Sequence, residues 1–230
     1  GSLVYFIDEK SELGRVWEIE FVPTSEAAAG AGLTVVDHIS QSMHYEEMLT
    51  WVLFYTSLLD LRKTGEQDVL DPGGLVKSQV VQSPDGALRI ALNASQSTRT
   101  QSSRFLTEAF GSGVQHIALA TDDIAATVAR LEANGVGLLR IPENYYDDLE
   151  AKTDLPPPRL DDLRAHNILY DRDGGAEYLQ VYTQTFEERF FFEIVERRGY
   201  AGFGAANAPI RLAAQTRLAR RRTAPASVEE

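Results

Sequence analysis

The sequence predicts an α+β fold in which two βαβββ modules form one cupped mixed sheet with helices outside. Two observations carry this prediction. Strand-like runs around His38 and His116 are each followed by a helical pattern, so the chain restarts the same order of elements halfway along. Short apolar or alternating runs, separated by turn residues, then follow in both halves. Such a repeat indicates two similar units whose first strands meet inside the cup.

Hydrophobic periodicity assigns the elements of the first module. Apolar residues such as Val52, Tyr55 and Leu59 recur at helical spacing, which predicts a helix with one apolar face. Turn residues at 71–73 and 84–86 separate runs that favour strands. The expected elements are a strand at 33–39, a helix at 45–59, strands at 61–69, 74–82 and 88–92, and a helix at 101–110.

The second module repeats this order with two additional short helices. Acidic residues at 122–123 and a glycine at position 135 mark the two ends of a helix. Prolines at 156–158 lie between the short helices. The expected elements are a strand at 113–119, a helix at 122–134, strands at 137–141, 168–171, 176–183 and 190–197, short helices at 145–152 and 160–165, and a closing helix at 207–222.

The two ends of the chain lie outside the repeat. Alternating residues at 4–7 and 16–22 predict a hairpin, which we interpret as the end of a preceding module. Because the chain opens on Gly1 and Ser2 without a methionine, we expect an N-terminal domain of the same protein to be missing. The expected organisation is a hairpin remnant at 1–24, a linker at 25–32, the paired metal-binding modules at 33–206, and a C-terminal helix with a basic and disordered tail at 207–230.

Composition narrows the class of function. The chain has 230 residues, of which 43% are hydrophobic and 24% charged, as in ordinary globular proteins. Its net charge of -12 argues against nucleic acid or an anionic membrane as a partner. The chain has no cysteine, which excludes disulfides and thiolate chemistry. With no long apolar run and no visible signal peptide, we expect a cytoplasmic protein, and we also expect a homo-oligomer.

His38, His116 and Glu193 form a candidate metal site. The histidines occupy equivalent positions in the two modules, and Glu193 lies among strand-favouring apolar residues, where an unpaired carboxylate would be costly. Each residue alone has a simpler interpretation, a structural histidine or a solvent-facing glutamate. Together, two imidazoles and one carboxylate are the facial triad of non-haem Fe(II) enzymes, which leaves coordination positions open for substrate and O2. The combination favours the metal site.

Other polar residues near these ligands have other interpretations. His44 lies at a strand-to-helix turn and His166 in a polar connection, so neither is expected to bind the metal. Alternation along the strand would turn Asp37 away from the side of His38, and we interpret Asp37 as structural.

A series of sequence blocks carries a family resemblance. The blocks are VDHI at 36–39, GVQHIALAT at 113–121, PENYYDDL at 142–149, ILYDRD at 168–173, YLQVYT at 178–183, FFEIVER at 191–197, and GFG at 202–204 with Asn207. From about Leu33 to Asn207 the chain resembles the C-terminal, catalytic half of the 4-hydroxyphenylpyruvate dioxygenase family, in the vicinal oxygen chelate superfamily. The ordered series is specific for the family, whereas a single block is not.

The resemblance implies a fold, a reaction and a set of site residues. The fold would be the vicinal oxygen chelate fold, and the ligands of Fe(II), or of another divalent metal, would be His38, His116 and Glu193. The substrates would be O2 and a small aromatic 2-oxo acid such as 4-hydroxyphenylpyruvate, which is oxidatively decarboxylated and hydroxylated on its ring. Catalytic polar residues would be Ser78, Asn93, Gln101, Gln115 and Gln180, and the substrate pocket would include Tyr182, Phe191, Phe203, Asn207 and Ala208.

Strand alternation agrees with part of this set. It places Gln180 and Tyr182 on one side of their strand, as residues that line a cup should be. It turns Gln115 away from the side of His116, so Gln115 is assigned on the resemblance alone.

Two departures from the family leave an alternative open. Tyr182 and Ala208 stand where the family encloses the substrate ring between two phenylalanines, which removes stacking of roughly 0.5–1.5 kcal/mol and enlarges the pocket. The residues after Gly204 are more similar to the dioxygenase-like domain fused to some bacterial 3-dehydroshikimate dehydratases. The alternative is therefore a metal-binding accessory or dimerisation domain of a bifunctional dehydratase, with little or no dioxygenase activity. A glyoxalase-like or antibiotic-binding module is a third and less favoured interpretation.

Overall fold

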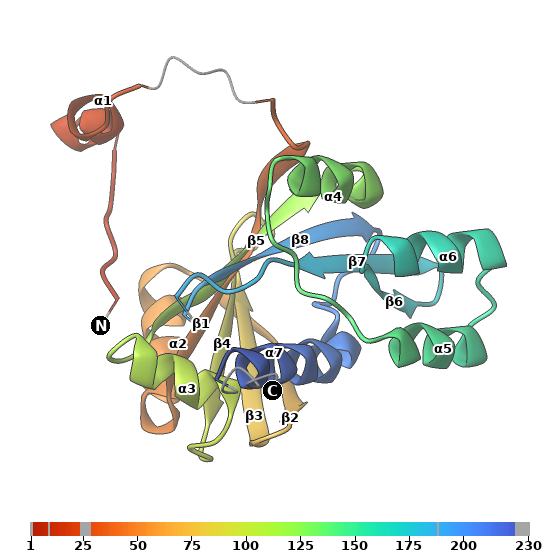
Figure 1. Ribbon diagram of the computed structural model, residues 1–230. Helices are drawn as coiled ribbons and strands as arrows, with labels where there is room; N and C mark the ends of the chain where they lie inside the picture. The colour runs from red at the N-terminus through yellow and green to blue at the C-terminus, as the bar shows by residue number, and fades with distance from the viewer. Residues whose placement is uncertain (1, 9, 24–28, 188, 224–230) are drawn as a thin grey trace, which may run out of the picture.

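The centre of the molecule is a curled mixed sheet of eight strands in the order β2-β3-β4-β1-β5-β8-β7-β6 (Figure 1). The computed structural model describes residues 2–8, 10–23, 29–187 and 189–223. The strands are β1 (Leu33–His44), β2 (Arg62–Asp71), β3 (Gly74–Gln82), β4 (Arg89–Ser95), β5 (Gly113–Thr121), β6 (Leu169–Asp173), β7 (Ala176–Tyr182) and β8 (Phe191–Arg198).

Helices connect and cover the strands. They are α1 (Val16–Glu20), α2 (Met48–Leu58), α3 (Gln101–Glu108), α4 (Ile124–Ala133), α5 (Glu143–Lys152), α6 (Pro157–Ala165) and α7 (Ala208–Thr223), with 3-10 turns η1 (Glu12–Arg15), η2 (Tyr45–Glu47) and η3 (Ala205–Asn207). Helices α2, α4, α5 and α6 lie outside the curled sheet, whereas α7 crosses in front of β2 and β3 (Figure 1). None of the helices within the described ranges is both long and apolar enough to cross a membrane.

The repeat predicted from the sequence is confirmed by the sheet topology. In each module the first strand runs parallel to the last one: β1 pairs with β4, and β5 pairs with β8. The two first strands, β1 and β5, pair antiparallel with each other at the middle of the sheet. The predicted α+β fold of two βαβββ modules around one cupped sheet is therefore correct.

The pairing of β1 with β5 contains β-bulges that matter for the site. Val36 and His38 face consecutive residues of β5, so Asp37 is an extra residue on β1. Further along, Ser40 pairs with His116 and the next residue of β1 pairs with Val114, which leaves Gln115 as an extra residue on β5. A bulge bends its strand and re-aims the neighbouring side chains, so simple alternation fails at these two positions.

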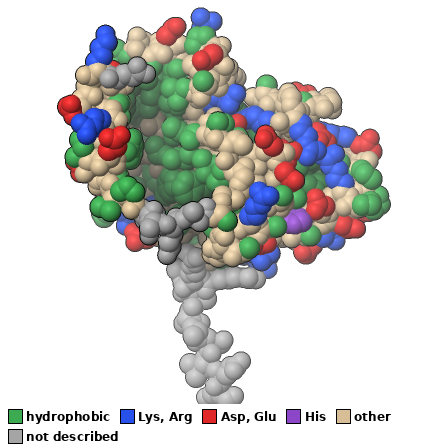
Figure 2. All heavy atoms as spheres, turned by 90° about the horizontal axis from the view of Figure 1, so that it is seen from above, with side chains coloured by type: hydrophobic (Ala, Val, Ile, Leu, Met, Phe, Trp, Pro, Cys, Tyr) green, Lys and Arg blue, Asp and Glu red, His purple; other side chains and the backbone are tan. Residues whose placement is uncertain are grey.

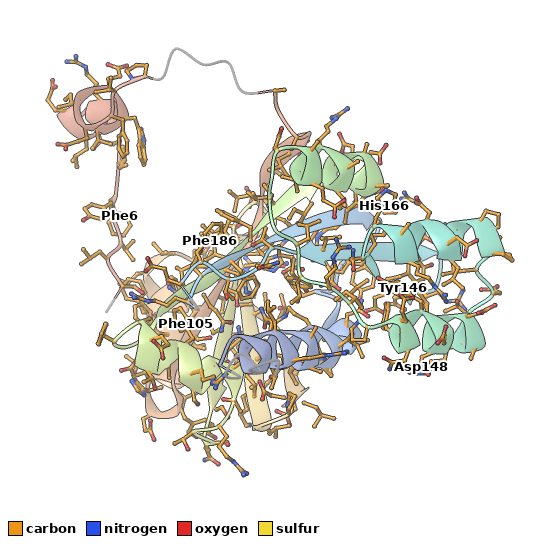
Figure 3. The ribbon with its side chains drawn as sticks, viewed as in Figure 1. Phe6, Phe105, Tyr146, Asp148, His166 and Phe186 are labelled. Carbon is orange, nitrogen blue, oxygen red and sulfur yellow. The ribbon has the colours of Figure 1, made fainter. Side chains whose placement is uncertain are left out.

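Two hydrophobic clusters pack helices against the sheet. One lies under α4, α5 and α6 and includes Val128, Tyr146 and Leu163. Tyr146 lies between α5 and α6 (Figure 3). The other lies under α2 and includes Tyr55 and Leu92. Each module thus buries its own helix outside the sheet, which leaves the inner face of the curl free to line a cavity.

Local signals in the sequence set several helix boundaries correctly. The Asp123 side chain caps α4 by accepting a hydrogen bond from the backbone N–H of Ala126 at 3.0 Å. The Thr100 hydroxyl caps α3 in the same way, through the N–H of Ser103. Gly135 follows α4 with φ of 79°, the left-handed conformation that glycine adopts most easily at the end of a helix.

The predicted N-terminal hairpin is wrong. Residues Val16–Glu20 form α1, and residues 3–7 belong to no strand. An isolated two-stranded hairpin is marginal in water, and no neighbouring strand supports it here. Ion pairs one turn apart, from Arg15 to Glu12 and Glu18, stabilise the short helix instead. Whether residues 1–24 belong to a preceding module remains a prediction.

This N-terminal arm approaches β5 at Ser2 but exposes many apolar side chains. Phe6 lies far from the body of the molecule (Figure 3), and Trp17 is 66% exposed. Seen from above, hydrophobic side chains line a broad hollow on this side of the molecule (Figure 2). Of the predicted linker at 25–32, residues 29–32 form no helix or strand, and the rest lies outside the described residues, as does the end of the tail at 224–230.

The predicted strand at 137–141 is also wrong. Only Leu138 forms an isolated bridge, to Thr183. The chain then turns into α5, with Pro142 as the residue before its first turn. Proline has no N–H to donate to a neighbouring strand, so pairing cannot continue through this position. The strand predicted at 33–39 is longer than expected and continues to His44.

Candidate metal centre

Three adjacent strands bring the predicted ligands together. His38 lies on β1, His116 on β5 and Glu193 on β8, and these strands are neighbours at the middle of the sheet. One ligand atom from each residue lies within 4.8 Å of the other two. The Nε2 atoms of His38 and His116 are 3.4 and 3.3 Å from Glu193 Oε2. All three side chains are buried, so two nitrogen donors and one carboxylate oxygen face one shared point.

Strand β7 holds the other oxygen of Glu193. Its Oε1 accepts hydrogen bonds from Gln180 Nε2 at 2.9 Å, Tyr182 Oη at 3.2 Å and Tyr178 Oη at 3.4 Å. These three donors alternate along β7 and therefore share one face of the strand, as predicted for Gln180 and Tyr182. Oε2 is left for the histidines or for a metal.

The charge of Glu193 is balanced within the site. Burial would raise the pKa of this carboxyl, but hydrogen bonds and charge interactions with His116 and His38 hold the pKa well below its usual range. Glu193 is therefore an anion at neutral pH, which is the state that binds a cation.

Asp37 orients His38, contrary to the expectation that it would face away. Its Oδ1 is 2.8 Å from His38 Nδ1, a contact that the β-bulge at Asp37 permits. Arg197 from β8 in turn donates two hydrogen bonds to the same carboxylate, at 2.7 and 2.8 Å. A carboxylate on Nδ1 favours the tautomer that keeps Nε2 as an acceptor, and it makes the imidazole a stronger ligand.

The two histidines differ in what surrounds the ring nitrogen Nδ1, which faces away from Glu193. Burial would lower the pKa of His38, but Asp37 and Glu193 raise it above its ordinary value. For His116 burial dominates, and together with the nearby charges of His38 and Arg211 it outweighs Glu193 and lowers the pKa to about 4. The Nδ1 of His116 has no hydrogen-bond partner among the described residues. Its ring stacks on Phe191, with centroids 4.7 Å apart. His116 is thus neutral at physiological pH, ready to act as a ligand.

A cavity of 510 Å³ opens in front of the three ligand side chains. The inner faces of β2, β3, β4 and β5 line it, together with residues 201–205 and the start of α7. Phe203 covers one side, with its ring 5.2 Å from that of His38. The predicted pocket residues that line this cavity are Ser78, Asn93, Gln115, Tyr182, Phe203 and Ala208.

The position of Gln115 beside His116 is explained by the β-bulge. Alternation would have turned the two side chains to opposite faces, but both line the cavity. Asn93 also faces it and donates to Ser40 Oγ at 2.8 Å. Ser40 is a polar cavity residue that the sequence did not single out, although it lies two residues after His38 and therefore on the same face.

Gln180 and Asn207 lie behind the ligand shell. Asn207 Nδ2 donates to Gln180 Oε1 at 3.0 Å, and Gln180 in turn contacts Glu193. Gly204 is required at the start of this loop, because its φ is 59° and a Cβ there would collide with Gln180 Oε1. These polar residues orient the candidate ligand Glu193, and they are not part of the cavity lining.

Gln101 and Phe191 line a neighbouring pocket. That pocket shares Gln115 with the metal cavity. Gln101 Nε2 donates to Thr216 Oγ1 of α7 at 2.8 Å, so it links α3 to α7. Gln101 is therefore brought together with Gln115 but not with Ser78, Asn93 or Gln180.

Arg211 is a cavity residue that sequence analysis missed. It lies on α7 one turn after Ala208, and both side chains line the cavity. The available signal was helical periodicity: once Ala208 is assigned to the pocket, the residue three positions later shares its helix face.

Comparison with known proteins agrees with this geometry. Residues 36–174 match the Glyoxalase/Bleomycin resistance protein/Dioxygenase superfamily. The chain belongs to this superfamily. It is 46% identical over 222 residues to a 3-dehydroshikimate dehydratase of Pseudomonas aeruginosa, covering 96% of this chain and 35% of that protein. It is 34% identical over 211 residues to a 4-hydroxyphenylpyruvate dioxygenase of Legionella pneumophila, covering 90% of this chain and 60% of the dioxygenase.

Solved structures of the superfamily share the fold. A fusion of a xylose isomerase-like TIM barrel with 4-hydroxyphenylpyruvate dioxygenase gives a TM-score of 0.69 at 47% identity, over 80% of this chain and 29% of the fusion protein. A mutant 4-hydroxymandelate synthase from Streptomyces coelicolor gives 0.74 at 28% identity, over 85% of this chain and 57% of the synthase. The family resemblance predicted from the sequence is confirmed, and the chain spans about a third of the dehydratases that it matches.

Proposed function

We propose that this domain binds Fe(II) through His38, His116 and Glu193 and oxidises a 2-oxo acid with O2, as a relative of 4-hydroxyphenylpyruvate dioxygenase. The observation that carries the proposal is the meeting of these three buried donors at the wall of a 510 Å³ cavity. Cavities of roughly 300–1,000 Å³ bind small organic ligands. The dioxygenases among its relatives support the reaction class.

The residues around the donors suit a divalent cation. Two neutral-nitrogen donors and one anionic oxygen are preferred by Fe(II), and another divalent ion could bind in its place. Iron bound there would supply the activation of O2, with open positions for a chelating acid. Asp37 fixes the ring of His38 through Nδ1, and the donors from β7 fix Glu193 through Oε1. The protein thus holds the donor geometry before the metal binds.

The remaining cavity residues would position the substrate and exclude water. Ser78, Asn93 and Gln115 present hydroxyl and amide groups to the cavity, where they can orient the polar ends of an aromatic acid. Phe203 shields the face of His38, which keeps the reacting centre dry.

Oxygen consumption tests this function. The chain, loaded with Fe(II) and supplied with ascorbate and 4-hydroxyphenylpyruvate, should consume O2 and release CO2 in equal amounts. Glu193→Gln keeps the shape of the side chain but removes its charge, and it should abolish both signals. His166→Ala is the matched control, because His166 lies on the outer surface next to α6 (Figure 3). Iron binding without O2 consumption would reject this substrate and leave the second candidate.

The second candidate is a metal-binding accessory or dimerisation domain of a bifunctional 3-dehydroshikimate dehydratase. The observations that favour it are the 46% identity to a protein of that name and the similarity to a TIM-barrel fusion protein. Both support the proposal that an N-terminal domain precedes this one in the same protein. The upstream reading frame of the parent gene tests this directly, and light scattering of the chain tests the proposed homo-oligomer.

A further inference from the structure

Arg211 places an unassigned positive charge in the metal cavity. Its guanidinium carbon lies 5.4 Å from the ring centroids of both Tyr182 and Phe191. These two rings are in direct contact with the metal ligands, because Tyr182 donates to Glu193 and Phe191 stacks on His116. The charge of Arg211 is therefore held one side chain away from two of the three donors.

The protein does not neutralise this charge. Among the described residues no carboxylate lies within ion-pair distance of Arg211, whereas Arg197 and Arg89 near the same site both contact Asp37. Arg211 donates to Gln215 Oε1 along its own helix, at 2.8 Å, and also contacts the Tyr182 hydroxyl, which leaves other N–H groups of the five that a guanidinium carries. Further donors are available to a ligand in the cavity.

Charge counting indicates what kind of ligand would suit the cavity. A divalent ion held by two neutral imidazoles and Glu193 keeps a surplus positive charge, which the carboxylate of a simple 2-oxo acid neutralises. Arg211 adds another positive charge that such an acid leaves unpaired. The remaining acidic residue of the lining, Glu66, is half exposed and pairs with Lys77 at 3.2 Å, so it is already balanced.

The helix also leaves room in front of the arginine. Ala208 precedes Arg211 by one turn and lines the same cavity, and side chains three residues apart on a helix are neighbours. A methyl group at position 208 keeps open the space beside the guanidinium that a larger side chain would fill.

We propose that Arg211 binds a second anionic group of the substrate, so that the ligand of this cavity is a 2-oxo acid carrying a further carboxylate. This inference rests on the proposed metal function, since the first carboxylate and the oxo group bind the metal. A guanidinium binds a carboxylate through two parallel hydrogen bonds, and cation–π contacts with Tyr182 and Phe191, each 5.4 Å from the guanidinium carbon, help to hold it at the cavity.

The test compares matched acids that differ by one carboxylate. The protein is first loaded with Co(II), whose visible absorption reports both metal binding and chelation by an added acid. Two pairs are then titrated: 2-oxoglutarate against 2-oxopentanoate, and 4-carboxyphenylpyruvate against phenylpyruvate. In at least one pair the dianion should bind about tenfold or more tightly, the effect expected of a charge-assisted hydrogen bond.

Variants of Arg211 test whether this arginine causes the preference for the dianionic acid. Arg211→Met keeps an unbranched apolar side chain and should remove the preference while Co(II) still binds, and Arg211→Lys should keep part of the preference. The control is Arg217→Met, because Arg217 lies on the same helix but faces a separate surface pocket. Equal binding within both pairs, or a preference that persists in Arg211→Met, would overturn the inference.

The two proposals fail in different steps of this experiment. If Co(II) does not bind, or binds equally well to Glu193→Gln, the metal site is wrong before any acid is added, and the role of Arg211 falls with it. If Co(II) binds normally and both acids of each pair bind alike, the role of Arg211 alone is wrong.

Discussion

Replacement of Asp37 by asparagine should weaken both the fold and the metal site. Asp37→Asn preserves the shape of the side chain and one oxygen that can accept from His38. It removes the charge that pairs with Arg197, and it points an amide N–H at a guanidinium that has only N–H groups to offer. The consequence for stability follows from how deeply this pair is buried.

The expected loss of stability in Asp37→Asn follows from the burial of its ion pair with Arg197. The side chains of Asp37 and Arg197 are 4% and 16% exposed, and loss of one partner from a buried ion pair costs about 3–5 kcal/mol. Arg197 also donates to the carbonyl of Tyr200, at 3.1 Å, so part of its hydrogen bonding survives. We therefore expect about 3 kcal/mol, which lowers the melting temperature of a chain of this size by about 6–12 °C.

Asp37→Asn should also lower the metal affinity, through a contact other than the one that lowers stability. Because Asp37 orients His38, its neutralisation should weaken Co(II) binding by about 10–100-fold. Adding Arg197→Met removes the unpaired charge, so the double variant should regain most of the stability but none of the metal affinity. Urea unfolding measures the first quantity and Co(II) absorption the second.

An exposed ion pair provides the control for Asp37→Asn. Asp154→Asn removes an exposed carboxylate that pairs with Arg172, and it should leave the unfolding midpoint unchanged. If Asp37→Asn unfolds at the same urea concentration as the original chain and binds Co(II) equally well, then Asp37 neither pairs with Arg197 nor orients His38 in solution.

Three further perturbations test other parts of the site and fold. Tyr182→Phe removes one donor from Glu193 and should weaken Co(II) binding up to about tenfold; unchanged binding would show that Gln180 suffices. Ala208→Phe should tighten phenylpyruvate binding by up to about tenfold through ring stacking, measured by the same absorption, and weaker binding would contradict the expected stacking. In Glu177→Gln, the stability lost relative to the original chain should shrink as pH falls below the ordinary glutamate pKa of 4.5.

The expected pH dependence of Glu177→Gln follows from the direction in which the pKa of Glu177 is shifted. Burial raises the pKa of Glu177, but hydrogen bonds from Arg159 and Tyr170 and the nearby arginine charges lower it below its ordinary value. A carboxyl with a lowered pKa stabilises the fold above its unfolded-state pKa, and this contribution disappears as pH falls through the folded-state pKa. Urea unfolding at several pH values measures it, and a difference that does not change with pH would contradict the ion pair with Arg159.

The module repeat and the three candidate ligands could be predicted from the amino-acid sequence alone. Equivalent placement of His38 and His116 and an apolar setting for Glu193 are properties of short segments, and period and composition report such properties directly. The same local reasoning failed at 16–22, where a strand-like pattern has no neighbouring strand and forms α1. Strand propensity mainly reflects how well side chains pack against a neighbouring strand. Where no neighbouring strand is present, it does not determine the local structure.

Only the tertiary structure decided what surrounds the ligands. Asp37 contacts His38, and Gln115 lines the same cavity as His116, because bulges between β1 and β5 shift the register, which is a property of the pair of strands. Asp37 meets Arg197 across 160 residues of chain, and Arg211 reaches the cavity because α7 packs across the inner face of the sheet. The candidate metal donors could be predicted from local pattern, but the charges around them come together only through packing between distant segments.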